Sequence, residues 1–326
     1  MSQAVADRPV SAITERAVAF VAAHKPEAEA LGRRLADEVN DPDQFAAILS
    51  EGFAGLADPV YHEGSRTVVP GLGPTHGVRW PLIQAANRGF REATRKDPTS
   101  VWLYLAERLF REPELEARWF AFGLLERLVL DDPERSWQLL RRAAREAGDW
   151  ATVDTLAHPV GKGILAEPYR WAELEQLVFA PSRWERRLVG STIATMPFID
   201  RKRSRTPEVA RRGLELIGQL IGDAEPDVQK ALSWALRSLT MVDLDATTAF
   251  IEAESVTAAA TADGHRAWVL RDALPKLGSR VADRLRTDLG GIRRKPGAAS
   301  TSTASQLASR FDDGRLGQPL AEPPLT

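Results

Sequence analysis

The chain has 326 residues, and its hydrophobic content of 44% and charged content of 27% are typical of a folded protein. It contains no cysteine, which excludes disulfides, thiolate catalysis and cysteine-ligated metal sites. The formal net charge of −2, taken alone, argues against a nucleic-acid-binding protein.

The chain also lacks the usual signals of a metal enzyme, a secreted protein or a membrane protein. Its five histidines are scattered and form no His-Glu-x-x-His pattern. The N-terminus has no apolar core of signal-peptide length, and no run of about 18 apolar residues occurs. We therefore expect a cytoplasmic protein without a metal ion, a cofactor or a membrane-spanning segment.

The first part of the chain, residues 1–60, is predicted to be helical. Apolar residues at three- and four-residue spacing predict two or three amphipathic helices over residues 11–56. Pro26 and the Asp41-Pro42 pair are expected to separate these helices.

The remainder of the chain divides into a loop, a long helical region and a tail. Residues 61–79 are rich in glycine and proline and predict a loop. The helical pattern resumes near Trp80 and continues through residues 80–290 without a convincing strand, so we expect an all-α fold. Residues 291–326 are small and polar and predict a flexible tail. The tail has a basic cluster, Arg293, Arg294 and Lys295, that either contacts phosphate or is a solvated patch.

Tryptophans recur along residues 80–290 with a period in the mid-thirties. They form three series: Trp102, Trp137 and Trp171; Trp119, Trp150 and Trp184; and Trp234 and Trp268. This period, with two helices per unit, is typical of an α-solenoid, in which one helix of each pair lines a concave surface. We assign Trp102, Trp137 and Trp171 to the core between repeats. The longer step from Trp184 to Trp234 predicts an insertion of roughly 16 residues that holds the basic run at 200–205.

Charge is segregated along the chain. Residues 25–58 contain three basic and eight acidic residues. Residues 183–212, the basic segment, contain nine basic and three acidic residues, a local net charge of +6. This distribution makes nucleic acid a candidate partner despite the overall balance.

The stretch from Gly148 to Gly161 combines a helix start with an unusual pair of side chains. Gly148 and Asp149 are typical of a helix boundary and its N-cap, and Trp150 follows directly. Asp154 lies four residues after Trp150, so the indole and the carboxylate share one helical face. An unpartnered carboxylate is costly in a core. Asp154 is therefore either solvent-exposed, bonded to a neighbouring helix, or part of a functional site.

Three helix starts carry motifs that resemble those of the bacterial DNA alkylation-repair glycosylases built from HEAT-like repeats, the AlkD type. The matching segments are Asp149-Trp150-x-x-Val153-Asp154, Trp184-x-Arg186-Arg187, Lys230-Ala231-x-x-Trp234-x-Leu236-Arg237 and, more loosely, Gly77-Val78-Arg79-Trp80-Pro81-Leu82. The resemblance covers about residues 75–280. The chain departs from the family pattern in the insertion around 198–208, the acidic N-terminal region and the tail.

The resemblance implies HEAT-like repeats with a concave DNA-binding face. It implies that Trp150, Asp154 and Trp234 face the lesion and act in catalysis. It also implies that Arg187, or alternatively Arg186, contacts the DNA backbone together with Arg237. Together with three further cations, the full set of DNA-binding residues that we expect is Arg183, Arg186, Arg187, Lys230, Arg237 and Arg271.

The implied activity is hydrolysis of the N-glycosidic bond of cationic purines alkylated at N3 or N7 in double-stranded DNA. We expect a monomer that needs no cofactor and associates with the nucleoid when bound to DNA. Two alternatives remain open at the level of sequence. One is a solenoid that binds damaged or branched DNA without catalysis, and the other is a protein-interaction scaffold, which the net charge of −2 would suit.

Overall fold

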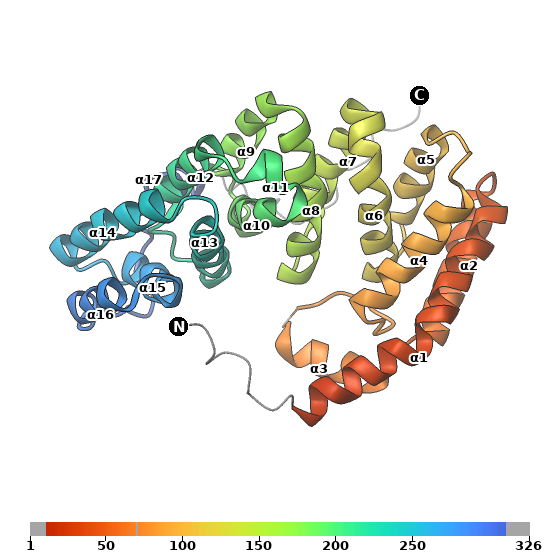
Figure 1. Ribbon diagram of the computed structural model, residues 1–326, viewed down its shortest axis with the longest axis horizontal. Coiled ribbons are helices and arrows are strands. Elements are labelled where there is room, and N and C mark those ends of the chain that lie inside the picture. The colour runs from red at the N-terminus through yellow and green to blue at the C-terminus, as the bar shows by residue number, and fades with distance from the viewer. Residues whose placement is uncertain (1–10, 70, 311–326) are drawn as a thin grey trace. The chain divides into compact units, whose positions relative to one another are not determined.

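The computed structural model describes residues 11–69 and 71–310. Within these ranges the regular elements are 17 α-helices and three short 3₁₀-helices, and no strand occurs (Figure 1). Consecutive helices pack in a repeat-like arrangement, which confirms the predicted all-α solenoid fold. Among the helices described, none is both long enough and apolar enough to cross a membrane.

The chain forms two compact units with a boundary at Leu124 and Leu125, inside one helix. The first unit contains α1 (Ala12–Leu35), η1 (Ala36–Glu38), α2 (Pro42–Gly55), α3 (Pro59–Val68), α4 (Trp80–Ala93), α5 (Ser100–Leu109) and the start of α6 (Leu115–Asp131). The predicted helices over residues 11–56 and the helix start at Trp80 are therefore confirmed.

The expected helix break at Pro26 is wrong, because Pro26 lies inside the continuous helix α1. The helix is held by its packing against α4. The two backbones approach so closely that a Cβ on Gly89 of α4 would lie 2.2 Å from the carbonyl oxygen of Glu29. The helix–helix contact offsets the backbone hydrogen bond that a proline removes.

The predicted loop over residues 61–79 is wrong in its first half, where residues up to Val68 belong to α3. Asp58 is the N-cap of α3 and Pro59 its first residue, a favourable helix start. The Asp58 carboxylate also accepts hydrogen bonds from Arg16 at 3.0 Å and from Arg79 at 2.7 Å. Burial raises the pKa of Asp58, but these hydrogen bonds outweigh burial and bring the pKa to about 2. The start of α3 is thus fixed by tertiary ion pairs.

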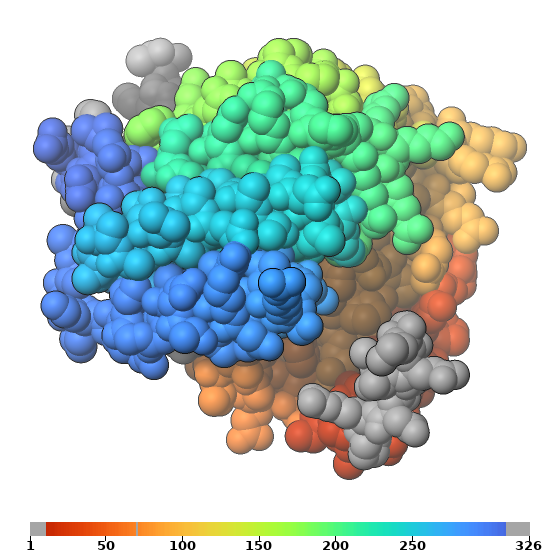
Figure 2. Space-filling model, turned by 60° about the vertical axis from the view of Figure 1, so that its left-hand side comes forward, coloured from red at the N-terminus to blue at the C-terminus, as the bar shows by residue number. Residues whose placement is uncertain are grey.

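The second unit contains the rest of α6, α7 (Pro133–Glu146), α8 (Trp150–Ala166), η2 (Pro168–Arg170), α9 (Trp171–Leu177), α10 (Arg183–Ile199), α11 (Arg201–Ser204), α12 (Pro207–Leu220), α13 (Pro226–Leu239), α14 (Leu244–Thr261), α15 (Gly264–Ala273), η3 (Leu274–Lys276), α16 (Ser279–Asp288) and α17 (Thr303–Ala308). Four successive pairs pack together, namely α7 with α8, α9 with α10, α12 with α13 and α14 with α15. In the space-filling view α14 forms a continuous band beside α15 and α16 (Figure 2).

The second helices of these pairs, α8, α10, α13 and α15, form a row, the inner row, in which each packs against the next (Figure 1). Contact is closest between α10 and α13, where a Cβ on Gly190 would lie 2.8 Å from the carbonyl carbon of Ala231. The four helices begin at Trp150, Arg183, Pro226 and Gly264.

The predicted insertion of roughly 16 residues between Trp184 and Trp234 is too long. The start of α13 follows the start of α10 by 43 residues, against 33 from α8 to α10. The repeat is therefore only 10 residues longer than its predecessor. The other part of the 50-residue step arises because Trp184 is the second residue of α10, whereas Trp234 is the ninth residue of α13.

The tryptophans fall into two groups according to burial. Trp102, Trp119, Trp137 and Trp171 are at most 6% exposed, which confirms the core assignment of three of them. The four inner-row tryptophans are partly exposed: Trp150, Trp184, Trp234 and Trp268. Trp80, at the start of α4, is 38% exposed.

The prediction of a flexible tail over residues 291–326 is wrong for its first part. Residues 303–308 form α17, and Ala304 and Ala308 are buried. The hydroxyl of Ser305 donates to Asp223 at 2.6 Å. Small side chains allow this segment to lie close to the second unit, and they give no amphipathic signal in the sequence. The tail beyond residue 310 lies outside the described residues.

Candidate active site

The predicted helix start at Trp150 is confirmed, and its N-cap is Asp149. The Asp149 carboxylate accepts hydrogen bonds from the backbone N–H of Thr152 at 2.8 Å and from its hydroxyl at 2.7 Å. Burial raises the pKa of Asp149, and these hydrogen bonds act against that rise. This cap fixes the first turn of α8 and therefore the positions of Trp150 and Asp154.

Asp154 is bonded to the neighbouring helix α10, one of the alternatives left open by the sequence. Its Oδ2 accepts a hydrogen bond from Arg187 Nη2 at 2.7 Å, and its Oδ1 accepts one from Arg187 Nε at 3.1 Å. The hydroxyl of Ser191, one turn further along α10, donates to Oδ1 at 2.6 Å. These three donors fix the orientation of the carboxylate.

The Asp154 carboxylate keeps one side open. An ionised carboxylate has about four acceptor positions, and three of them are occupied here. The side chain is 21% exposed. One acceptor position on a fixed, negatively charged group is therefore available to a water molecule or a cationic ligand.

Arg187 connects three helices of the inner row. Besides its bidentate pair with Asp154 on α8, it donates through Nη1 to the backbone oxygen of Asp227 on α13 at 2.7 Å. Its guanidinium carbon lies 5.8 Å from the centre of the Trp150 ring. The residue is 5% exposed, so the geometry makes it a positioning residue for Asp154 rather than a surface contact to DNA.

Arg186 points in another direction, and its burial contradicts the expected DNA contact. Its Nε donates to Asp223 at 2.7 Å, and its Nη1 donates to the backbone oxygens of Ala180 and Pro181. Arg186 is 6% exposed. The sequence could not distinguish the adjacent arginines, whereas the structure assigns Arg187 to the candidate site and Arg186 to the interior.

Trp234 is placed on α13, with α10 between it and α8. It shares one face of α13 with Lys230 and Arg237, since these residues are spaced by four and three. Trp234 is partly exposed and Lys230 is exposed. The structure thus brings Trp150, Asp154 and Arg187 into one group and puts Trp234 on the neighbouring inner-row face.

The remaining expected DNA contacts differ in their surroundings. The Arg183 side chain is 48% exposed, with its guanidinium carbon 4.7 Å from the centre of the Trp184 ring. Arg237 is engaged with Asp272, and Arg271 donates to the backbone oxygens of Leu289 and Ile292, both at 2.7 Å. Lys230 is therefore an accessible cation, and Arg183 is accessible but pairs with Glu225 at 3.6 Å. The guanidinium groups of Arg237 and Arg271 are engaged by partners within the protein.

Sequence reasoning missed Ser191 and the carbonyl of Asp227 as members of the group. Ser191 lies four residues after Arg187, so the helical spacing already placed the two on one face. The carbonyl of Asp227 is backbone and leaves no residue-type signal.

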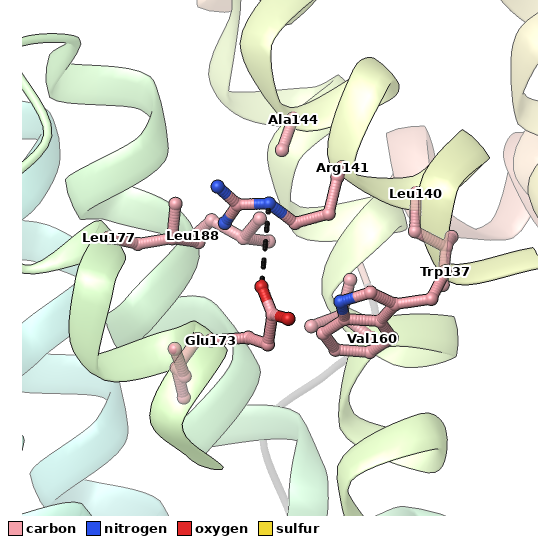
Figure 3. Close-up of a pocket in the computed structure, with 9 residues that line it drawn as sticks. Trp137, Leu140, Arg141, Ala144, Val160, Glu173, Leu177 and Leu188 are labelled. Carbon is pink, nitrogen blue, oxygen red and sulfur yellow. Dashed lines mark ion pairs between the residues drawn. The ribbon is translucent and has the colours of Figure 1, made fainter. Parts of the chain in front are cut away.

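A pocket elsewhere in the second unit does not include these residues. It lies among α7, α8, α9 and α10 and is lined by Trp137, Leu140, Arg141, Ala144, Val160, Glu173, Leu174, Leu177 and Leu188 (Figure 3). Arg141 and Glu173 face each other across it at 3.9 Å. In residues 11–69 and 71–310, no three His, Asp or Glu side chains form a group that could hold a metal ion.

The helices pair and form an inner row, and the N-terminal turns of α8, α10 and α13 bring together Asp154, Arg187 and the carbonyl of Asp227. These features define a helical-repeat protein with a polar site on one row of helices. The family described as DNA alkylation repair enzyme matches residues 49–277, more than two thirds of the chain. The chain therefore belongs to the DNA alkylation repair enzyme family, which confirms the resemblance seen in its motifs. It is an enzyme of DNA repair, with DNA as its substrate. No curated protein matches the chain.

Proposed function

We propose that the protein is a monofunctional DNA glycosylase that hydrolyses the N-glycosidic bond of purines alkylated at N3 or N7 in duplex DNA. The observation that carries this proposal is the Asp154 carboxylate. Arg187 and Ser191 hold it in one orientation, and one of its acceptor positions has no partner among the described residues.

The chemistry needs little more than this group. A purine alkylated at N3 or N7 is cationic, so it leaves as a neutral base with the electron pair of the glycosidic bond and needs no general acid. The sugar becomes oxocarbenium-like in the transition state. Asp154 stabilises that positive charge and orients a water molecule, which attacks the anomeric carbon and loses a proton to the carboxylate or to solvent. Atoms and charge balance without a cofactor.

Trp150 contributes through the face of its indole. An indole attracts a cation by its quadrupole, with a contribution of roughly 0.5–2 kcal/mol. The guanidinium carbon of Arg187 lies 5.8 Å from the centre of this ring, which supports a role for the ring face in attracting positive charge. Trp234 offers a second indole from α13, and a bound duplex that spans α10 would reach both.

DNA affinity comes from Lys230, an exposed cation of the inner row that forms no ion pair within the described residues, and to a smaller extent from Arg183, which is half exposed but pairs with Glu225 at 3.6 Å. Such contacts to phosphate are independent of sequence and weaken with salt. The protein binds duplex DNA as a monomer in this proposal.

Asp154→Asn tests the proposal. The substitution retains size and polarity, so we expect the fold and most of the DNA affinity to remain, while base release falls by roughly 10²-fold or more. The measurement is single-turnover formation of abasic sites in a duplex that contains 7-methylguanine, without added cofactor and normalised to DNA-bound protein. Asp288→Asn, an exposed carboxylate at the end of α16, is the matched control and should behave as wild type.

Two outcomes would overturn the proposal. An Asp154→Asn rate within threefold of the wild type would remove Asp154 from catalysis. Wild-type protein that binds the duplex without releasing the base would favour the solenoid that binds damaged DNA without catalysis.

Arg187→Lys separates positioning from binding. A lysine keeps the charge but loses the bidentate geometry toward Asp154. We expect slower base release with an unchanged salt dependence of DNA binding, because Arg187 is buried in the protein. A lower salt slope would instead assign Arg187 to a phosphate.

A further inference from the structure

Residues 291–302, the C-terminal strap, run along the N-terminal ends of α15 and α13. At α15, a Cβ on Gly264 would lie 2.2 Å from the backbone oxygen of Arg293. His265 Nε2 lies 3.2 Å from the backbone oxygen of Ala298. At α13, Arg294 Nη1 donates to Gln229 Oε1 at 2.8 Å. The strap is therefore seated on two helices of the inner row.

The far end of the strap is anchored by hydrogen bonds. The backbone N–H of Thr301 donates to the backbone oxygen of Gly222 at 2.8 Å. The Ser302 hydroxyl donates to the backbone oxygen of Gln219 at 2.6 Å, and the Thr301 hydroxyl donates to Asp263. These contacts hold the strap in a defined position on the second unit.

The strap carries positive charge that no carboxylate of the described residues neutralises. Residues 291–310 contain Arg293, Arg294, Lys295 and Arg310 and no acidic residue. Arg294 has a neutral amide oxygen and the Trp268 ring, at 4.8 Å, as its partners. In the described part of the chain, Arg293, Arg294 and Lys295 form no ion pair, and all three are exposed.

Arg271 adds a fourth cation next to the strap, and its partners are backbone carbonyl groups. Burial lowers the pKa of Arg271, and the nearby charges of Arg293 and Arg294 lower it further. Cations that lie close together without a counter-ion repel one another, and a bound polyanion reduces this repulsion.

The strap lies next to the candidate site. It contacts Gln229 near the start of α13, two residues after Asp227, whose carbonyl accepts the hydrogen bond from Arg187. The exposed Lys230 follows directly on α13. A backbone that passes the site at α8 and α10 and continues along the inner row meets Lys230 and then the strap.

We propose that the C-terminal strap binds the phosphate backbone of duplex DNA beside the lesion, through Arg293, Arg294 and Lys295. This inference rests on the proposed function for its location and extends it, since the strap enlarges the DNA contact by one repeat beyond the catalytic group.

The test is the salt dependence of binding to a duplex with 7-methylguanine, measured by fluorescence anisotropy. The variant Arg293→Gln with Lys295→Gln removes two exposed charges whose side chains make no hydrogen bond within the described residues. We expect the slope of log K against log salt to fall by about 1–2, and affinity at about 0.1 M salt to fall by roughly tenfold or more. The melting temperature should be unchanged.

Two further variants control for charge. Lys276→Gln with Arg280→Gln removes two exposed cations beyond the opposite end of α15 and should leave the slope unchanged. Arg293→Lys with Lys295→Arg keeps the charge and should retain the slope. An unchanged slope in the first variant, or an equal drop in the Lys276 and Arg280 control, would overturn the inference.

Base release in the same samples separates this inference from the proposed function. At saturating protein, the strap variant should release the base at the wild-type rate, because the strap does not touch Asp154. If the strap variant shows a lower salt slope and neither it nor the wild type releases the base, DNA binding by the strap is supported and the glycosylase activity is overturned. If both proteins release the base and the strap variant has the wild-type salt slope, the glycosylase activity is supported and DNA binding by the strap is overturned.

Discussion

The basic segment, residues 183–212, and the C-terminal strap both carry an excess of positive charge. They differ in the share of their cations that forms ion pairs. In the basic segment six of the nine cations form ion pairs: Arg183, Arg186, Arg187, Arg203, Arg211 and Arg212. In the strap none of the described cations has a carboxylate partner. Arg201, Lys202 and Arg205 of the basic segment also form no ion pair within the described residues, so the two runs differ in the fraction of their charge that is neutralised.

The difference shows why a count of charges along the sequence is a poor guide to a DNA-binding surface. Four of the acidic partners of the basic segment lie outside it: Asp154, Glu215, Asp223 and Glu225. When these four partners are counted with the three acidic residues of the segment, its nine basic residues face seven acidic ones. Pairing within the segment has a visible effect as well, because hydrogen bonds from Arg211 and Arg212 lower the pKa of Glu208 to about 2. Charge that is neutralised within the fold contributes little to phosphate binding.

The largest effect is expected for Arg186→Met. The substitution leaves the Asp223 carboxylate buried without its guanidinium partner. We expect the free energy of unfolding to fall by about 3–5 kcal/mol, the scale of breaking a buried ion pair. Urea denaturation measures this loss. Unchanged stability together with a weaker salt dependence of DNA binding would place Arg186 on the DNA-binding surface after all.

Removal of residues 291–326 is expected to have the next largest effect. The truncation removes the hydrogen bonds of Thr301, Ser302 and Ser305 to the second unit and uncovers the apolar contacts of α17. We expect a loss of roughly 3 kcal/mol, at about 1 kcal/mol for each hydrogen bond. Thermal unfolding is the measurement.

The matched control for this truncation ends after Arg310 and keeps every described contact of the strap and α17. The difference in melting temperature between the two truncations measures the contribution of residues 291–310. Equal melting temperatures would show that these residues do not stabilise the second unit.

The third prediction concerns the pH dependence of the strap. Burial raises the pKa of Asp263, but hydrogen bonds from Thr301 and Arg266 together outweigh burial, so the pKa lies below its ordinary value of 3.8. A carboxyl group with a lowered folded-state pKa stabilises the fold above about pH 4 and loses this contribution as pH falls through the lowered value.

Thr301→Val removes one of the hydrogen bonds that lower this pKa. We therefore expect the variant to be less stable than wild type at pH 7, with the difference shrinking below about pH 4. Urea denaturation at pH 7 and pH 3 measures it. A difference that does not depend on pH would mean that Thr301 acts only through packing.

The smallest effect is expected for Arg211→Gln in the basic segment. Arg211 is exposed and pairs with Glu208 and Glu215 within one helix. Exposed pairs of this kind contribute little, so the free energy of unfolding should change by less than about 1 kcal/mol. The salt slope of DNA binding should also stay unchanged. A slope that falls as much as in the strap variant would show that paired and unpaired arginines contribute alike.

The sequence by itself determined the features that depend on local spacing. The period of the tryptophans predicted the solenoid, and the Asp149-Trp150 start of α8 was identified correctly because an N-cap acts within one helical turn. The motifs on α8, α10 and α13 also identified the family, since each lies within a few residues of chain. The core positions of Trp102, Trp137 and Trp171 followed from the same period.

Only the tertiary structure decided what depends on distant partners. Arg186 and Arg187 are adjacent in the chain, yet their carboxylates, Asp223 and Asp154, lie 37 and 33 residues away in opposite directions. The helix at Pro59–Val68 and the packed strap were missed because Asp58 with its arginines, and Gly222 with Thr301, meet only in the fold. Helical periodicity and caps are encoded within one or two turns, whereas ion pairing and burial depend on which helices the packing brings together.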